Sequence, residues 1–399
     1  MVGYSKRITE ISMLVFLVLR LTFLYFFFFY KTYSIMCNQY FSSVQCIIPP
    51  YINDKLTTST DKNIANNAVN AKFRSFRFRS DRDFIKNTNT QEKLVLGAIS
   101  KKQDKLKVPR LEVYNCKKST SLSAATLVWN DASTKLPADK DAKNVINGGK
   151  ATWQLYYDLF GRNSIDNLGM VIQQYIHFDK KYNNAFWDGR KMVFGDGDGT
   201  LFGSFTADID IIGHELTHGV TQFEANLDYH LQAGALNESF SDIFGILIKQ
   251  RVLNQDVKQS NWLIGENVLL GNEYSLRSLK EPGTAYKNHP EIGDDPQPAT
   301  MDEFIKLPDS AAGDWGGVHY NSGIPNFAFY VAALNMGGFA WEKAGRIWYG
   351  ALTDTVNLTC KATFSDLKKV TLKIAGQLFG AKSLEVKAVK AGWDAAKVK

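Results

Sequence analysis

Hydrophobic residues near the middle of the chain recur at helical spacing in two successive stretches. In the first stretch the apolar positions are three or four residues apart: Ile209, Ile212, Leu216 and Val220. The second stretch has the same spacing: Leu236, Phe240, Ile243 and Leu247. Because a helix has 3.6 residues per turn, each set forms one apolar stripe, and the pattern predicts two consecutive amphipathic helices.

The flanking patterns predict strands before these helices and more helices after them. Residues 107–135 and 171–178 alternate between apolar and polar positions, as half-buried strands do. A helical pattern over residues 141–160 separates the two strand regions, and helical patterns interrupted by glycine run through residues 324–399. The hydrophobic pattern therefore predicts an α+β protein, with strands concentrated in one half and helices in the other.

A long apolar segment stands near the start of the chain. Residues 11–30 carry a single charge, Arg20, and 20 such residues are enough to cross a bilayer. Lys6 and Arg7 precede them, as positive residues precede a signal peptide or a signal anchor. We therefore expect residues 1–36 to be a hydrophobic signal or anchor segment, and the protein to be secreted or anchored in a membrane.

Two alternatives stay open for this segment. No small-x-small cleavage site is evident before Cys37, so a retained anchor is at least as consistent with the sequence as a cleaved signal peptide. If translation instead begins at Met36, residues 1–35 are not part of the protein and the protein is cytoplasmic.

Charge separates the N-terminal region from the rest of the chain. Residues 1–106 hold 16 Lys or Arg against 7 Asp or Glu, a balance of +9, whereas the remainder holds 31 against 33, a balance of −2. No zinc-finger or RNA-binding motif accompanies the basic residues, and we expect no nucleic-acid partner. The four cysteines include no CxxC pair, which argues against a disulfide framework and leaves the redox compartment open.

The first of the two central helices contains the sequence His214-Glu215-Leu216-Thr217-His218. Residues four apart lie on one face of a helix, so the two histidines point the same way, as two imidazole ligands of one zinc ion do. Glu215 lies about 100° further round the helix, where it can reach a metal-bound water but is poorly placed to be a ligand. A motif this short also arises by accident and needs a third ligand in context.

The second helix supplies that context. A catalytic zinc needs a third protein ligand and one open position, and Glu238 is the candidate ligand. Asp242 lies one turn further along the same face, where its carboxylate can accept the free N–H of His214 and fix the tautomer of that ring. The two helices together predict a catalytic site with one zinc ion.

With these residues in view, residues 107–399 resemble the thermolysin-like zinc metalloproteases, in which HExxH is followed by a glutamate ligand in a G-A-x-N-E-x-x-S-D helix. The resemblance is strongest at residues 214–218 and 234–242. It implies a two-domain fold, with a β-rich lobe over residues 107–220 that includes the zinc helix and a helical lobe over residues 221–399. It also implies a zinc-dependent endopeptidase that acts on peptide or protein substrates.

The N-terminal region has a resemblance of its own. Cys46-Ile47-Ile48-Pro49-Pro50-Tyr51 is similar to the Pro-Pro-Tyr segment that opens the short propeptides of the protealysin-like branch. We therefore expect residues 37–106 to be a propeptide, partly strand or helix, that lies over the protease as its intramolecular inhibitor and makes the protein a zymogen. The alternation of basic and aromatic residues over 72–84 would also suit a nucleic-acid or membrane patch.

The resemblance implies which residues stabilise the reacting carbonyl. Tyr229, eleven residues after His218, and His319 match donors to the oxyanion, and Asp314 matches the acid that orients His319. Glu215 is implied as the general base that takes a proton from the zinc-bound water and passes it to the leaving amine. Taken alone, the Gly-Gly pair beside His319 indicates only a loop.

Substrate contacts are implied by three further matches. Asn184 and Ala185 match an edge strand that pairs with an extended peptide, a mode that gives affinity without demanding one sequence. Arg277 matches a buried arginine that hydrogen-bonds a substrate carbonyl, although taken alone it would suit a surface salt bridge. Matches at Leu276, Phe202 and Ile211 imply an apolar pocket. Such a pocket implies a preference for a hydrophobic residue just after the scissile bond.

Calcium is not expected at the double site that many family members have beside the zinc helix. Asp210 matches one ligand position, but Lys249 replaces the carboxylate expected on the next helix. A lysine ammonium has donors and no acceptor, so it cannot ligate a cation, and we expect it to pair with Asp210.

Two other functions compete with the endopeptidase. The first is an inactive, membrane-anchored binding protein with a relict metal site, and the intact Glu215, Asp314 and His319 argue against it. The second is a zinc enzyme of the aminopeptidase type, which would want an upstream carboxylate motif for the free amine of its substrate. No such motif is found, and the preferred substrate length would separate the two enzymes.

Overall fold

The computed structural model describes residues 45–88, 108–271 and 273–399. The predicted membrane segment, residues 11–30, lies outside these ranges. Inside them, no helix combines the length and the apolar character that a membrane crossing requires.

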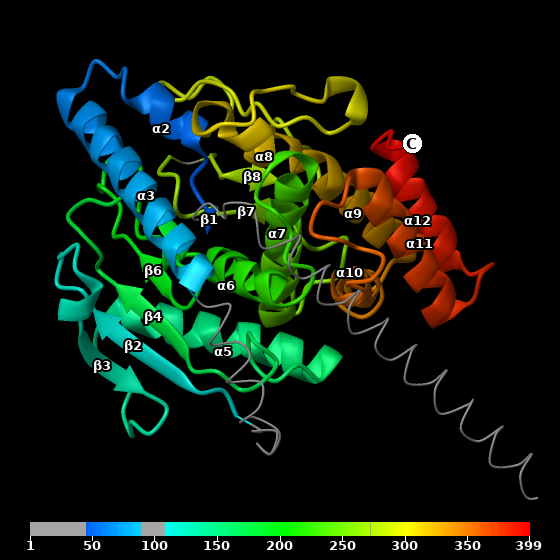
Figure 1. Ribbon diagram of the computed structural model, residues 1–399, viewed down its shortest axis with the longest axis horizontal. Helices are drawn as coiled ribbons and strands as arrows, with labels where there is room; N and C mark the ends of the chain where they lie inside the picture. The colour runs from blue at the N-terminus through cyan, green and yellow to red at the C-terminus, as the bar shows by residue number, and fades with distance from the viewer. Residues whose placement is uncertain (1–44, 89–107, 272) are drawn as a thin grey trace, which may run out of the picture. The chain divides into compact units, whose positions relative to one another are not determined.

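Six strands form one mixed sheet in the order β1-β5-β6-β4-β2-β3 (Figure 1). The strands are β1 (Gln45–Cys46), β2 (Leu111–Asn115), β3 (Thr126–Asn130), β4 (Ile172–Ile176), β5 (Ala185–Trp187) and β6 (Met192–Phe194). Strands β2, β4 and β6 run parallel, while β1, β3 and β5 pair antiparallel with their neighbours. Strands therefore form in both regions where alternation predicts them, and β1 adds a strand from the predicted propeptide.

Helices dominate the later part of the chain, as the pattern predicts. In chain order the helices of the described residues are α2 (Pro50–Leu56), α3 (Lys62–Thr88), α5 (Lys140–Phe160), α6 (Ile209–Phe223), α7 (Leu231–Leu253), α8 (Asp314–Asn321), α9 (Gly323–Met336), α10 (Ala344–Thr353), α11 (Phe364–Phe379) and α12 (Leu384–Ala395). A short ladder of β7 (Leu263–Ile264) and β8 (Arg277–Ser278) precedes α8. In Figure 1, α6 and α7 lie between the sheet and helices α9 to α12.

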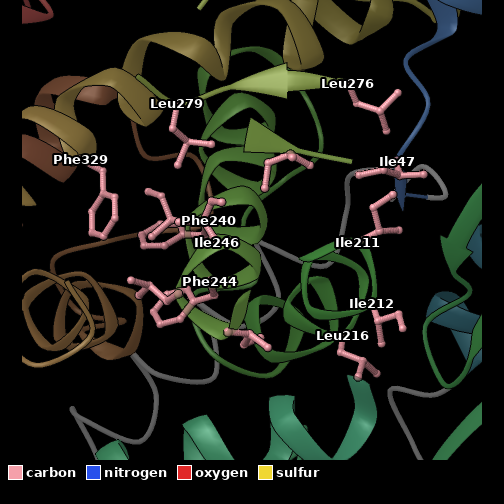
Figure 2. Close-up of a cluster of buried hydrophobic side chains, with 14 of the residues drawn as sticks. Ile47, Ile211, Ile212, Leu216, Phe240, Phe244, Ile246, Leu276, Leu279 and Phe329 are labelled. Carbon is pink, nitrogen blue, oxygen red and sulfur yellow. The ribbon is translucent and has the colours of Figure 1, made fainter. Parts of the chain in front are cut away.

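The two predicted apolar stripes lie at the centre of the hydrophobic core (Figure 2). Ile212 and Leu216 of α6 lie on one side of the view, and Phe240 of α7 lies on the other, toward Phe329 of α9. Gly245 lets the two helices approach closely, because a Cβ at this position would lie 2.5 Å from the carbonyl oxygen of Asp210. This close packing brings side chains of α7 within reach of those on α6.

His177 links the sheet to the start of α5 through hydrogen bonds. His177 follows β4 and lies between two carboxylates, with Nδ1 2.7 Å from Asp196 Oδ1 and Nε2 2.9 Å from Asp139 Oδ2. Asp139 is also the N-cap of α5, where it accepts the N–H of Ala142. The hydrogen bond with Asp196, opposed by burial and reinforced by Asp139, raises the pKa of His177 to about 9.

This cluster predicts a loss of stability in mild alkali. Because the pKa of His177 is raised above its unfolded value of 6.5, the stabilisation is complete below about pH 6.5 and is lost as pH rises through about 9. After allowance for solvent screening we expect a loss of roughly 1–2 kcal/mol. Urea unfolding at pH 6 and pH 9.5 measures it, with His177→Gln as the control that lacks the titrating group. An equal loss in both proteins would rule out this source of pH dependence.

The part of the predicted propeptide that the structure describes, residues 45–88, is called the prosegment below. Pro50 opens α2 at a position where its missing N–H costs nothing, and Tyr51 of α2 packs against Tyr320, with ring centroids 4.3 Å apart and ring planes tilted by 41°. In α3, the guanidinium of Arg74 lies 3.0 Å from the Asp179 carboxylate. The prosegment thus contains both strand and helix and packs on the rest of the chain at both ends.

Candidate active site

The three predicted metal ligands meet where α6 and α7 pack together. His214 Nε2 and His218 Nε2 are 3.0 Å apart, and the Glu238 carboxylate oxygens lie 3.5 Å from the first and 3.4 Å from the second. Ligand atoms of a tetrahedral zinc ion, at bond lengths of about 2.0–2.1 Å, are about 3.3 Å apart. Glu238 Oε2 is buried and has no hydrogen-bond partner among the described residues. The donor set therefore fits a zinc ion in both identity and spacing.

The other nitrogen of each histidine ring is held by a neighbour on α7. His214 Nδ1 lies 2.9 Å from Asp242 Oδ1, which is the predicted contact. His218 Nδ1 lies 2.9 Å from both Asn237 Oδ1 and Ser241 Oγ. With these acceptors holding a proton on Nδ1, each Nε2 keeps its lone pair for a metal. Asn237 and Ser241 belong to the quoted α7 motif, but the sequence reasoning gave them no role.

Glu215 lies on α6 beside the ligands, and its side chain is fully buried. Neither carboxylate oxygen has a hydrogen-bond partner in the described ranges. Burial, reinforced by the charge of Glu238, raises the pKa of Glu215 well above its ordinary value. A carboxyl group in this setting is suited to taking a proton from a nearby water.

His319 reaches the same site from α8. Asp314 holds it twice: Asp314 Oδ1 lies 2.6 Å from His319 Nδ1, and Asp314 Oδ2 accepts the backbone N–H of His319 at 2.8 Å. The chain between them is left-handed, with φ of +85° at Gly316 and +78° at Gly317. This turn brings the carboxylate back onto the histidine, which a regular helix would not do.

Tyr229 completes the set of predicted donors. Its hydroxyl lies 3.0 Å from His319 Nε2 and donates a hydrogen bond to Glu238. The structure therefore gathers Tyr229, His319 and Asp314 beside the metal ligands, although they come from separate parts of the chain.

Arg277 is a buried partner of Asp242 rather than a surface residue. Its Nε and one terminal nitrogen donate to the two Asp242 oxygens at 2.8 and 2.7 Å. Burial alone would raise the pKa of Asp242, but the Arg277 charge and the bond with His214 hold it below its ordinary value. Asn326 of α9 donates to the same carboxylate at 2.9 Å. No local pattern pointed to Asn326, because its contact with Asp242 spans 84 residues.

Strand β5, expected to pair with an extended peptide, is paired with β1 of the prosegment. The Ile47 N–H donates to the Ala185 carbonyl at 3.2 Å, and the Ile48 N–H donates to Asn184 Oδ1 at 3.1 Å. Asn184 and Ala185 thus make the peptide contacts that were predicted for them, with the chain's own prosegment as the peptide.

Two side chains near the metal ligands also touch this peptide. A terminal nitrogen of Arg277 donates to the Ile47 carbonyl at 2.9 Å, and His319 Nε2 lies 3.2 Å from the Cys46 carbonyl oxygen. His214 and His218 lie roughly opposite Leu216 on α6, so packing of that apolar stripe in the core would leave them facing a cleft, yet both are completely buried. The difference arises because the prosegment covers the face that would otherwise be open.

Two of the three residues matched to an apolar pocket lie beside the prosegment. Phe202, Ile211 and Leu276 all belong to the main hydrophobic core, as does Ile47. Figure 2 shows the Ile47 side chain lying between Leu276 and Ile211. The pocket therefore accepts an aliphatic side chain from an extended peptide.

Lys249 occupies the place expected of a calcium-binding carboxylate and pairs with Asp210, as predicted. Its ammonium lies 3.1 Å from Asp210 Oδ2, donates to the Leu263 carbonyl at 2.9 Å and also donates to Glu266. Asp210 is completely buried, and this positive charge compensates it.

Comparisons with known proteins agree with this geometry. The model of the thermolysin metallopeptidase catalytic domain matches residues 63–222, and that of the thermolysin metallopeptidase alpha-helical domain matches residues 225–398. The chain is 39% identical to protease PrtS of Photorhabdus sp. over 84% of this chain and 87% of the relative. It is 45% identical to an extracellular metalloprotease of Pectobacterium carotovorum over 61% of this chain and 68% of the relative.

A solved structure agrees as well. The precursor of protealysin, a metalloproteinase from Serratia proteamaculans, superposes with a TM-score of 0.76 at 37% identity, over 89% of this chain and 100% of that one. The two family models together span residues 63–398, apart from residues 223 and 224. Together with the ligand geometry, they show that the chain belongs to the thermolysin family of zinc metalloendopeptidases.

Proposed function

We propose that the protein is a zinc endopeptidase made as a latent zymogen, whose prosegment occupies the substrate groove until it is removed. The observation that carries this proposal is the pairing of β1 with β5, together with the contacts of Ile47 and Ile48 to Arg277 and Asn184. An extended segment held by these backbone and side-chain groups excludes a second peptide from the same place. Residues 37–106 would then be the propeptide, and the mature lobes would be residues 107–220 and 221–399.

The proposed chemistry assigns one step to each residue. Zinc held by His214, His218 and Glu238 would polarise the scissile carbonyl and lower the pKa of a water molecule beside it. Glu215 accepts the proton of that water and delivers it to the leaving amide nitrogen. This assignment rests on a buried carboxylate without a competing hydrogen-bond partner among the described residues.

Three further residues serve to stabilise the carbonyl oxygen, two of them directly and one through its neighbour. Tyr229 and His319 donate hydrogen bonds to it as negative charge develops, and Asp314 keeps the His319 ring in position. The Tyr229 hydroxyl, which now donates to Glu238, must turn toward the substrate for this purpose. A buried site with fixed donors stabilises the transition state more than water does.

Specificity follows from the apolar pocket. Leu276 and Ile211 lie on either side of Ile47, the residue that follows the carbonyl facing His319, and Phe202 is buried in the same core. We propose that the enzyme prefers a hydrophobic residue just after the scissile bond. A relative described as extracellular supports a secreted protein.

The test combines zinc stoichiometry with casein hydrolysis, with and without a chelator, on the full-length chain and on a chain that begins at residue 107. The expected results are one bound zinc, chelator-sensitive hydrolysis by the shorter protein and latency in the longer one. Equal hydrolysis by both proteins would contradict latency. Zinc binding without hydrolysis by either protein would favour the alternative, an inactive binding protein.

Calcium independence is a separate prediction. We expect millimolar calcium to leave the Tm of the protein unchanged, because the Lys249 ammonium occupies the position of a ligand oxygen. Differential scanning fluorimetry measures this, with Lys249→Glu as the positive control. That variant places a fourth acid beside Asp208, Asp210 and Glu266, and it should have a low Tm in chelator that calcium raises. A calcium-dependent rise in the Tm of the unaltered protein would contradict the prediction.

A further inference from the structure

We propose that the Cys46–Ile47 peptide bond of the prosegment is itself a substrate of this active site and is the first bond that the zinc-loaded chain cuts. The inference rests on the proposed function and goes beyond latency. It states that the prosegment is bound in the direction and register of a hydrolysed peptide, so that one particular bond stands in the scissile position.

The backbone contacts fix the direction. Strand β1 runs antiparallel to β5, and three successive contacts lock its register. They are Ile47 N–H to the Ala185 carbonyl at 3.2 Å, Ile48 N–H to Asn184 Oδ1 at 3.1 Å, and Arg277 to the Ile47 carbonyl at 2.9 Å. Since side chains alternate along an extended strand, a slip by one residue would turn Ile47 out of its pocket. Several independent contacts therefore fix both the direction and the register of the prosegment strand.

The carbonyl that faces the chemistry is that of Cys46. His319 Nε2 lies 3.2 Å from this oxygen, whereas the next carbonyl, that of Ile47, is held away by Arg277. The Tyr229 hydroxyl lies 3.0 Å from the same His319 nitrogen, so one nitrogen contacts both the Cys46 oxygen and the second proposed oxyanion donor.

The group that would leave is also in place. The backbone N–H of Ile47 donates to the Ala185 carbonyl at 3.2 Å, and the Ile47 side chain lies between Leu276 and Ile211 (Figure 2). The Cys46 carbonyl thus faces His319, the Ile47 nitrogen is held by the edge strand, and the following side chain lies among apolar residues, which is the order that hydrolysis requires. A segment bound in the reverse direction would not offer this order.

The step balances without a co-reactant other than water. The water oxygen bonds to the Cys46 carbonyl carbon, the Cys46–Ile47 C–N bond breaks, and Glu215 transfers a proton to the Ile47 nitrogen. The products are a carboxylate on Cys46 and an amino group on Ile47. No group is oxidised or reduced.

The proposed cleavage uses the backbone of Cys46 and not its thiol. The Cys46 side chain is buried in a hydrophobic cluster with Phe178 and Phe186. The contacts that carry the proposal are made by the Cys46 carbonyl and by Ile47. Cys46→Ala should be cut at the same bond.

The experiment follows zinc-loaded full-length protein over time by intact-mass and N-terminal peptide mass spectrometry. We expect the earliest new N-terminus to be Ile47, formed at a first-order rate that does not change with protein concentration. Glu215→Gln should not form it. Ile47→Leu should be cut as the parent is, whereas Ile47→Asp should be cut about 100-fold more slowly, since the pocket is apolar.

A second measurement uses zinc-free protein and so does not depend on activity. Hydrogen exchange over residues 45–56 should be faster in Ile47→Asp than in the parent, because the charged side chain loses its pocket, and unchanged in Ile47→Leu. Unchanged exchange in Ile47→Asp would contradict the register.

Failure of this inference can be distinguished from failure of the proposed function. Chelator-sensitive casein hydrolysis by the same zinc-loaded sample, after trypsin treatment and inactivation of the trypsin with a serine-protease inhibitor, tests the enzyme alone. If casein is hydrolysed while the Cys46–Ile47 bond stays intact, or if the first cut falls elsewhere, the inference is wrong and the endopeptidase stands. If the sample cuts neither its own chain nor casein, both are wrong.

Discussion

Glu215→Gln is expected to lower the rate of peptide hydrolysis by about a thousand-fold or more, with zinc still bound at the level of the parent protein. An amide cannot accept the proton of the attacking water, but it has nearly the shape of the carboxylate that it replaces. The ligands His214, His218 and Glu238 keep their positions, because Glu215 has no hydrogen-bond partner among the described residues that the change would break. Casein hydrolysis and zinc content on the protein that begins at residue 107 measure the two effects.

The matched control for this variant is Glu342→Gln, which makes the same chemical change at an exposed position near α10. It should leave both hydrolysis and zinc content unchanged. Hydrolysis by Glu215→Gln within tenfold of the parent would show that another group is the base.

Arg277→Met is expected to destabilise the fold by about 3–5 kcal/mol. The guanidinium is 1% exposed and makes two hydrogen bonds to Asp242, whose carboxylate is completely buried. Its loss leaves a buried carboxylate whose remaining hydrogen-bond partners within the described ranges are His214 and Asn326, neither of which carries a permanent positive charge. Urea unfolding of zinc-free protein measures the free energy directly.

The control for this second prediction is Arg346→Met, because Arg346 lies on α10 and is exposed. Exposed substitutions of this kind usually change the free energy of unfolding by no more than about 0.5 kcal/mol. Equal stability of the two variants would mean that Asp242 does not need a buried positive partner. Arg277→Met should also loosen the prosegment, since the same side chain holds the Ile47 carbonyl.

The metal-ligand helices could be predicted from sequence because their geometry is local. Four residues advance a helix by just over one turn, so the spacing of His214 and His218 determines that both point to one side. The same rule aligns Glu238 with Asp242 on α7. The pairing of Lys249 with Asp210 could also be predicted from sequence, because an ammonium group cannot act as a metal ligand in any surroundings.

Resemblance to a family supplied what spacing could not. Tyr229, Arg277 and His319 carry no local pattern that marks them as partners of α7, and their convergence depends on how loops and helices pack. For Asn326 even the resemblance gave no indication, and only the packing of α9 against α7 revealed its bond to Asp242.

The sequence by itself determined the two helices, the ligand set and the division into strands followed by helices, because periodicity and donor chemistry are properties of neighbouring residues. The tertiary structure alone decided what fills the groove and in which register. Pairing of β1 with β5 joins residues about 140 positions apart, and such a contact depends on the shape of the whole sheet and pocket. For the same reason, the side of α6 that carries His214 and His218 is buried. Its own apolar pattern predicts that this side faces a cleft, but the prosegment, from the N-terminal part of the chain, covers it.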